Sequence, residues 1–317
     1  MGEKPGIGSR ETLTGRYARY REMMCREVAG LDGVLRHGAM EPVAFLALAD
    51  RYEVILLDAF GVLNVGGQPI PGAPEVVSAL LAAGRSLLVV SNNASQSPGG
   101  ILRRLNGMGF PLRAEHILSS GMAVGHFVAG SRYRDRPYFL VGSSASAEHY
   151  APGAETWMVN RPGGCLEEAE YVLMCSNRDY YGGEQEVLLN HLLARKPLPV
   201  LLANPDLVAP AGDGVMEVVA GFTAMDLADR FQLPLEGIGK PFAPIFREAW
   251  RRFPGVPAAR ILMVGDTLDT DILGAKAMGF ASCLTLSGAY VGMEGELDSL
   301  CAVRGIRPDY VVASIGG

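Results

Sequence analysis

Residues 54–61 read Val54-Ile55-Leu56-Leu57-Asp58-Ala59-Phe60-Gly61, so four apolar residues lead directly into a carboxylate and then into a glycine. A short apolar run is typical of a strand buried in a parallel sheet. The pattern places Asp58 at the carboxyl end of such a strand, where open α/β sheets bind their ligands. A carboxylate there can attack phosphorus and form an aspartyl-phosphate. In isolation, an aspartate that only caps the following turn is the commoner explanation.

The same alternation of apolar runs and helical segments continues on both sides of this stretch. It predicts an α/β fold in which helices cover both faces of a parallel sheet. The expected strands of this sheet are residues 54–57, 86–90, 260–264, 281–286 and 310–312. The expected helices are residues 72–83, 98–108, 121–129, 245–253 and 271–278.

The length of 317 residues favours two domains, because a single hydrophobic core stops growing at about 250–300 residues. Residues 134–236 carry their own alternation of apolar strands and helices, which indicates an inserted domain. We expect residues 1–50 to form an N-terminal helical extension, and residues 51–133 and 237–317 to form the core domain that receives the insert.

The composition excludes several kinds of partner. A net charge of -6 gives no basic surface for nucleic acid or for an anionic membrane. The polar N-terminus lacks the apolar segment of a signal peptide, and no run approaches the ~20 apolar residues of a membrane span. Five cysteines without C-x-x-C spacing argue against a disulfide framework and against a zinc site. We therefore expect a cytoplasmic protein.

Two further segments offer groups that bind phosphate. Ser91, Asn92 and Asn93 follow an apolar strand, where a hydroxyl and backbone N–H groups can donate to a phosphoryl oxygen. Capping of the next helix is the alternative for these polar residues. Lys240 stands between Gly239 and Pro241, which fixes its backbone and lets its ammonium neutralise a phosphate, although a lone lysine is more often a solvated surface charge.

A fourth segment is rich in carboxylates. Asp266 ends an apolar strand, and Asp269 and Asp271 follow within five residues, so we expect three carboxylates to crowd one turn. Like charges so close would raise one another's pKa unless a cation lay between them. Mg²⁺ prefers oxygen ligands and takes one or two protein carboxylates together with phosphate and water. Asp271 is also suited to cap the next helix.

Together the four segments resemble the haloacid dehalogenase (HAD) superfamily of phosphohydrolases. The segment 66–73, the Asn204-Pro205-Asp206 sequence and the position of the insert resemble the class IIA branch, which contains NagD-like and phosphoglycolate-type phosphatases. The resemblance implies a Rossmann-like parallel sheet core with an inserted α/β cap domain of the C2a type. It also implies Mg²⁺-dependent hydrolysis of a small phosphorylated metabolite, and it leaves a homodimer open.

The resemblance assigns roles to the candidate residues. Asp58 would be the nucleophile, and Ser91 and Lys240 would bind phosphate. Asp58, the backbone carbonyl of Phe60 and Asp266 would hold Mg²⁺. Asp271 would stand behind these ligands. The remaining residues expected to bind the phosphate or the rest of the substrate are Asn92, Asn93, Asn204 and Asp206.

One residue departs from the family pattern, because Phe60 stands where the second aspartate is expected. That aspartate protonates the leaving alkoxide and then activates water, and general acid–base assistance is worth ~10²- to 10⁴-fold. A slow phosphatase is therefore our leading hypothesis, with Asp206 as a candidate proton donor. A catalytically impaired phosphate-ester binding or regulatory protein is the main alternative, and phosphotransfer to an acceptor bound by the cap is a third.

Overall fold

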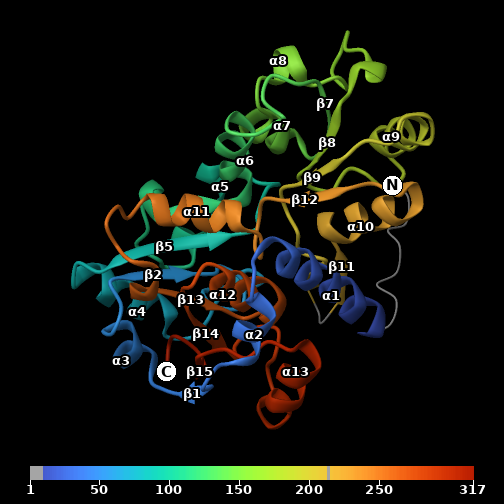
Figure 1. The fold of residues 1–317 in the computed structure, drawn as a ribbon. Helices are drawn as coiled ribbons and strands as arrows, with labels where there is room; N and C mark the ends of the chain where they lie inside the picture. Colours follow the sequence, from blue (N-terminus) through green and yellow to red (C-terminus); the bar gives the residue numbers. More distant parts are fainter. Residues whose placement is uncertain (1–9, 213–214) are drawn as a thin grey trace. The chain divides into compact units, whose positions relative to one another are not determined.

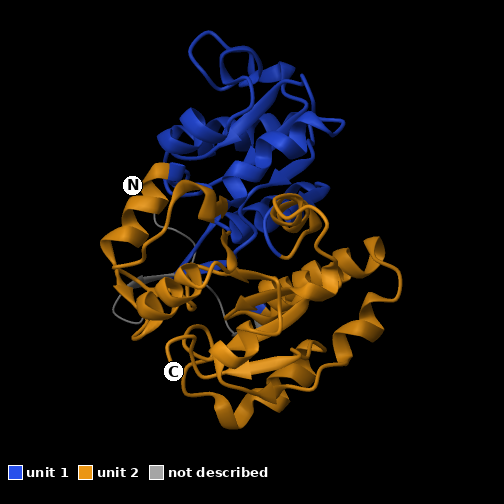
Figure 2. Ribbon diagram, turned by 90° about the vertical axis from the view of Figure 1, so that its left-hand side faces the viewer, with its two compact units in different colours: residues 1–13, 92–98, 119–240 blue, residues 14–91, 99–118, 241–317 orange. Residues whose placement is uncertain are grey.

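The computed structural model describes residues 10–212 and 215–317, and these fall into two compact units. The described residues of unit 1, blue in Figure 2, are 10–13, 92–98, 119–212 and 215–240. Unit 2, orange in Figure 2, contains residues 14–91, 99–118 and 241–317. Each unit has its own sheet, so we describe them separately.

Within the described residues of unit 2, seven strands form the main sheet in the order β1-β15-β14-β13-β2-β5-β6, and all of them except β6 are labelled in Figure 1. Their bounds are β1 Glu41–Pro42, β2 Val54–Leu57, β5 Ser86–Ser91, β6 Ile117–Ser119, β13 Ile261–Gly265, β14 Ala281–Thr285 and β15 Tyr310–Val312. The strand β2 is entirely buried and pairs in parallel with β13 on one side and β5 on the other. β2 is therefore an interior strand, and its carboxyl end lies between those of β13 and β5.

Helices cover this sheet and a small hairpin follows β2. The helices are α1 Arg10–Glu27, α2 Leu31–Arg36, α3 Phe45–Ala49, α4 Ala73–Ala82, α5 Pro98–Gly107, α11 Ala243–Arg251, α12 Leu273–Ala277 and α13 Leu297–Arg304. The short turns are η1 Ala114–His116, η3 Ala258–Arg260, η4 Leu268–Ile272 and η5 Glu294–Glu296, and the hairpin pairs β3 Asn64–Val65 with β4 Gln68–Pro69. Helices α4 and α11 contact β5, and α12 contacts β14.

The predicted strands of the core are confirmed, and the structure adds β1 and β6, which are too short to give a sequence signal. The helix expected over residues 271–278 differs in detail. Residues 268–272 form a π-helical turn, η4, and regular α-helix begins only at Leu273. Single π-helical turns are frequent at functional sites.

Unit 1 contains, among its described residues, a four-stranded parallel sheet in the order β12-β9-β8-β7. The strands are β7 Tyr138–Val141, β8 Tyr171–Met174, β9 Val200–Leu202 and β12 Leu235–Gly237, and a hairpin pairs β10 Val208–Gly212 with β11 Val215–Val218. The helices are α6 Ser120–Ala129, α7 Ser144–Tyr150, α8 Ala154–Trp157, α9 Glu184–Arg195 and α10 Ala220–Phe231, with a short turn η2 Leu166–Glu168. The βα alternation expected for residues 134–236 is therefore present.

The N-terminal segment is helical, as expected, although residues 1–9 lie outside the described residues. The contacts also assign residues 92–98 and 119–133 to unit 1. The domain boundaries expected from the sequence stay a prediction, because groups of contacts and domains need not end at the same residues. Among the described residues, no helix combines the length and the apolar character needed to cross a bilayer.

Candidate active site

Asp58 lies at the carboxyl end of β2, as the sequence predicts. Its backbone N–H donates to the carbonyl oxygen of Val264 at 2.9 Å, which continues the ladder between β2 and β13 by one residue. The backbone N–H of Ala59 donates to Asp58 Oδ1 at 2.6 Å. Since the apolar residues before it are buried and Asp58 is only half-buried, the sheet presents this carboxylate at its edge.

Gly61 turns the chain after Asp58 and is required there for two reasons. Its φ of 73° lies in the left-handed region, which side chains rarely adopt. A Cβ at this position would also lie 2.0 Å from Asp266 Oδ2. The turn is held by the N–H of Gly61, which donates to the Asn64 carbonyl at 2.8 Å, and by Ser287 Oγ, which donates to the Gly61 carbonyl at 2.7 Å.

Three carboxylates converge at this edge of unit 2. Asp58, Asp266 and Asp271 each offer one oxygen, and these oxygens lie within 4.8 Å of one another. Asp266 is 5% exposed and Asp271 is fully buried, so water screens their charges poorly. Their mutual repulsion favours a bound cation, and an all-oxygen set of this kind suits Mg²⁺ or Ca²⁺.

Backbone and hydroxyl donors fix the carboxylates of Asp266 and Asp271. Asp266 Oδ2 accepts the backbone N–H of Ala289 at 2.9 Å, and its Oδ1 accepts the hydroxyl of Thr267 at 3.0 Å. The backbone N–H of Thr267 donates to Asp271 Oδ2 at 3.2 Å. Gly288 makes room for this arrangement, because a Cβ there would lie 2.1 Å from Asp266 Oδ2.

The expectation that the carboxylates of Asp266, Asp269 and Asp271 lie together is wrong for Asp269. Asp269 pairs instead with Arg304, at 3.3 Å between Oδ2 and Nη1, and the third carboxylate of the cluster is Asp58. Burial raises the pKa of Asp269 to about 6, and the Arg304 guanidinium opposes that rise. Of the two aspartates in η4, Asp269 therefore contacts Arg304 and Asp271 joins the carboxylate cluster.

Ser91 ends β5, the neighbour of β2 in the sheet, and is half-buried. The next two residues, which belong to unit 1, use their side chains differently. Asn93 Oδ1 accepts the backbone N–H groups of Ser95 and Gln96, both at 3.0 Å. The side chain of Asn93 thus caps the following turn, which was the alternative considered for this segment.

Asn92 joins three parts of unit 1 through its side-chain amide. Its Oδ1 accepts the backbone N–H of Lys240 at 2.7 Å, and its Nδ2 donates to the Lys240 carbonyl at 2.9 Å and to Asp206 Oδ1 at 2.8 Å. Asn204 Oδ1 in turn accepts the backbone N–H of Asp206 at 3.0 Å. Lys240 is 1% exposed, so the predicted surface alternative for this lysine is excluded.

Thr267 and Ala289, which donate to the carboxylates, and Ser287, which donates to the Gly61 turn, were not predicted from the sequence. A signal for the last two was present. The predicted strand 281–286 is parallel to β2, so the residues after it had to reach the same sheet edge.

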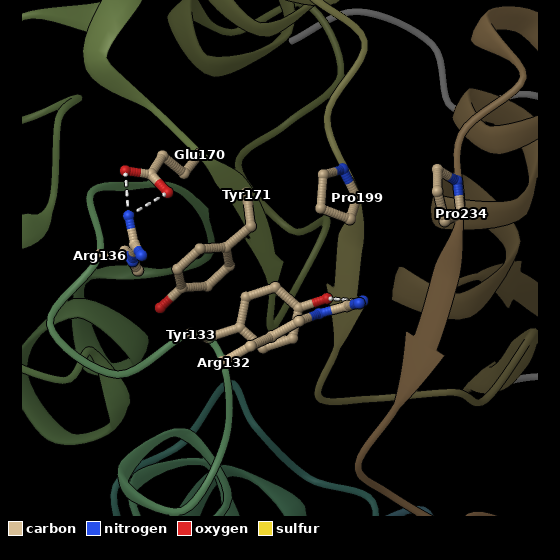
Figure 3. Close-up of a pocket in the computed structure, with 7 residues that line it drawn as sticks. All are labelled: Arg132, Tyr133, Arg136, Glu170, Tyr171, Pro199 and Pro234. Atoms are coloured by element: carbon tan, nitrogen blue, oxygen red, sulfur yellow. Dashed lines mark hydrogen bonds and ion pairs between the residues drawn. The ribbon is translucent and has the colours of Figure 1, made fainter.

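A hollow of about 340 Å³ lies elsewhere, at the amino ends of β8, β9 and β12 in unit 1 (Figure 3). Its two arginines are already paired. Arg136 contacts both carboxylate oxygens of Glu170, at 3.2 and 3.1 Å, and Arg132 contacts Glu236 at 3.0 Å. This hollow therefore lacks the positive charge that would recognise a phosphate.

Two family models and several known proteins match this chain. Residues 55–152 match the family model described as haloacid dehalogenase-like hydrolase, and residues 237–317 match one described as HAD-hydrolase-like. Chronophin from Homo sapiens is 30% identical over 276 residues, which cover 84% of this chain and 91% of chronophin.

Solved structures of phosphatases are similar to this chain over most of its length. The p-nitrophenyl phosphatase from Archaeoglobus fulgidus superposes with a TM-score of 0.71 at 28% identity, over 84% of this chain and 97% of that chain. A glycerol phosphate phosphatase from Mycobacterium tuberculosis in complex with magnesium superposes with a TM-score of 0.69 at 26% identity, over 84% of this chain and 76% of that chain.

Proposed function

Because the chain belongs to the haloacid dehalogenase-like hydrolases, in their class IIA branch, we propose that it is a Mg²⁺-dependent phosphatase of small phosphate monoesters. The family, the α/β fold with a cap domain and the hydrolase class predicted from the sequence are confirmed by this membership. The observation that carries the proposal is the convergence of Asp58, Asp266 and Asp271 at one sheet edge.

In the proposed reaction, Asp58 attacks the phosphorus atom of the ester. A bond forms between the Asp58 carboxylate and phosphorus while the bond from phosphorus to the ester oxygen breaks, and the alkoxide leaves and takes a proton from water. Water then attacks phosphorus, which releases inorganic phosphate and restores the carboxylate. The hydrogen bond from the N–H of Ala59 supports this role, because it orients the Asp58 carboxylate before substrate binds.

The residues that would hold Mg²⁺ are Asp58, Asp266 and the backbone carbonyl of Phe60, with Asp271 behind them. When bound, the ion would neutralise charge on the carboxylates and on the phosphoryl oxygens. The burial of Asp266 and Asp271 supports this assignment, because two buried carboxylates beside Asp58 need a positive counter-charge.

Ser91 and Lys240 are proposed to bind the phosphoryl oxygens. Asn92 directly follows Ser91, and its side-chain amide forms hydrogen bonds with both the backbone N–H and the carbonyl of Lys240. We therefore assign the Asn92 side chain to positioning Lys240, which leaves its backbone N–H for any contact with phosphate. The side chain of Asn93 is similarly engaged in capping. Asn204 and Asp206 remain candidates for contacts with the rest of the substrate.

Phe60 sets the limit on this activity. Its side chain has no proton to give or accept, so the leaving alkoxide of an alkyl phosphate departs without an acid and the phospho-enzyme hydrolyses without a base. Aryl phosphates need less help, because a phenolate leaves readily. The same residue favours the second candidate function, a phosphate-ester binding protein that retains recognition without turnover.

A panel of phosphate esters separates the two functions. We would assay p-nitrophenyl phosphate and glycerol-3-phosphate with Mg²⁺ and with a chelator, using Asp58→Asn as the control. A phosphatase cleaves the aryl ester in Mg²⁺ and the alkyl ester much more slowly, and loses both activities in the chelator and in the variant. Binding of esters without cleavage of either one would favour the binding protein.

A further inference from the structure

The N-terminal helix α1 is part of the core of unit 2 from Thr14 onward. Tyr20 and Met24 are fully buried. The ring of Tyr20 packs edge-on against the ring of Phe242, with centroids 5.3 Å apart. Phe242 lies two residues after Lys240, so α1 contacts the segment that leads away from this lysine.

A second contact runs from α1 to the end of α13. The guanidinium of Arg304 lies over the ring of Tyr17 at 5.5 Å from its centroid. Arg21 Nη1 donates to the backbone carbonyl of Arg304 at 3.1 Å. Arg21 is itself held by an ion pair with Asp32, which lies in the first turn of α2. Both the side chain and the backbone of Arg304 are therefore held by α1.

The same guanidinium reaches the carboxylate-bearing turn. Arg304 Nη1 lies 3.3 Å from Asp269 Oδ2, and the two side chains are only 15% and 4% exposed. Asp269 stands in η4, between Asp266 and Asp271. Burying an unpaired carboxylate is costly, so the position of Arg304 constrains where Asp269, and with it the turn, can lie.

We propose that Arg304 is a positioning residue that ties α1 to η4 through Asp269, and so holds Asp266 and Asp271 in the geometry of the carboxylate cluster. Helix α1 then contributes to cation binding in addition to covering the sheet. This inference rests on the proposed function for the identity of the cation, but the ordering of η4 is independent of it.

Two kinds of measurement test this without using activity. Amide hydrogen exchange of a peptide spanning residues 266–272 in metal-free protein reports the order of η4. Calorimetric titration with Mg²⁺ alone reports cation affinity. Arg304→Gln removes the charge, Arg304→Lys keeps it, and Tyr17→Leu removes the ring on α1. Arg307→Gln is the matched control, because Arg307 pairs with the exposed Asp298 at 2.9 Å on the same terminal segment.

We expect Arg304→Gln to speed exchange in residues 266–272 by about 10-fold or more and to weaken Mg²⁺ binding by about 10-fold, the lower end for partners of ligating residues. Arg304→Lys and Tyr17→Leu should lie between this variant and the wild type, and Arg307→Gln should match the wild type. In the Asp269→Asn background, Arg304→Gln should add little, because Arg304 acts through Asp269.

Equal exchange in Arg304→Gln and Arg307→Gln would overturn the inference, as would unchanged or tighter Mg²⁺ binding by Arg304→Gln. If Arg304→Gln does not fold, the milder Arg304→Lys and Tyr17→Leu decide by the same two measurements. If the wild type binds no Mg²⁺, the metal dependence of the proposed function fails, and exchange in the metal-free protein still decides the role of Arg304.

Discussion

Phe60→Asp should raise turnover of an alkyl phosphate such as glycerol-3-phosphate, because it places a carboxyl group two residues after Asp58. The turn has room for the change. Phe60 is half-buried and larger than aspartate, and its backbone is held by a bridge to Asn64 that does not involve the side chain. Full burial of a phenylalanine is worth about 1.5–3 kcal/mol, so partial loss should cost about 1 kcal/mol of stability.

The expected gain follows from two opposing effects. General acid–base assistance of ~10²- to 10⁴-fold corresponds to a fall of about 3–5 kcal/mol in the activation free energy. A fourth carboxylate near Asp58, Asp266 and Asp271 costs about 1–4 kcal/mol at 4 Å, depending on the local dielectric. A bound cation offsets much of this repulsion. We therefore expect a rise in kcat of about 10²-fold for the alkyl ester and a smaller rise for an aryl ester.

Steady-state kinetics on glycerol-3-phosphate and p-nitrophenyl phosphate at saturating Mg²⁺ measure this effect. Phe60→Asn is the matched control, because it has the shape of the aspartate variant without its exchangeable carboxyl proton. If the aspartate variant folds and binds Mg²⁺ but turns over glycerol-3-phosphate no faster than the asparagine variant, the reasoning about residue 60 is refuted.

Three further outcomes are expected. Gly61→Ala should weaken Mg²⁺ binding by about 10- to 100-fold in calorimetry, since its Cβ would lie 2.0 Å from a carboxylate oxygen of the cluster, and unchanged affinity would contradict the site. Asn92→Asp replaces the donor to the Lys240 carbonyl by an acceptor, so KM for phosphate esters should rise and the free energy of unfolding should fall by about 1–3 kcal/mol. If KM and Tm both equal those of the wild type, the hydrogen bonds from Asn92 to Lys240 are dispensable. At mildly alkaline pH, iodoacetamide should label the exposed Cys165 first, and it should label Cys175, whose pKa burial raises to about 12, only after unfolding; early labelling of Cys175 would contradict the packing of unit 1.

The sequence was sufficient for the sheet and for the two carboxylates that end its strands. An apolar run that stops at a polar residue is a local signal, and parallel strands bring such stops to one edge. The sequence alone therefore placed Asp58 and Asp266 at the same sheet edge. Asn93 also followed a local rule, because an asparagine side chain readily accepts backbone N–H groups two and three residues ahead.

Other parts of the site depend on partners far along the chain. Asn92 and Asn93 are the same residue type, and what separates them is Lys240, which only the folded chain brings to Asn92. Asp269 and Asp271 follow the same strand, and their directions are set by the π-helical winding of η4 and by Arg304 in α13. Neither feature has a sequence signal at the position where it acts.

The most direct test of the central claim is to look for phosphate on Asp58. The protein would be mixed with p-nitrophenyl phosphate and Mg²⁺, quenched in acid and digested, and its peptides would be analysed by mass spectrometry. Because Phe60 cannot activate water, we expect the phospho-enzyme to accumulate, with phosphate on Asp58 and a burst of nitrophenol that Asp58→Asn abolishes. Cleavage of the ester with no phosphate on Asp58, or cleavage that persists in Asp58→Asn, would contradict the account.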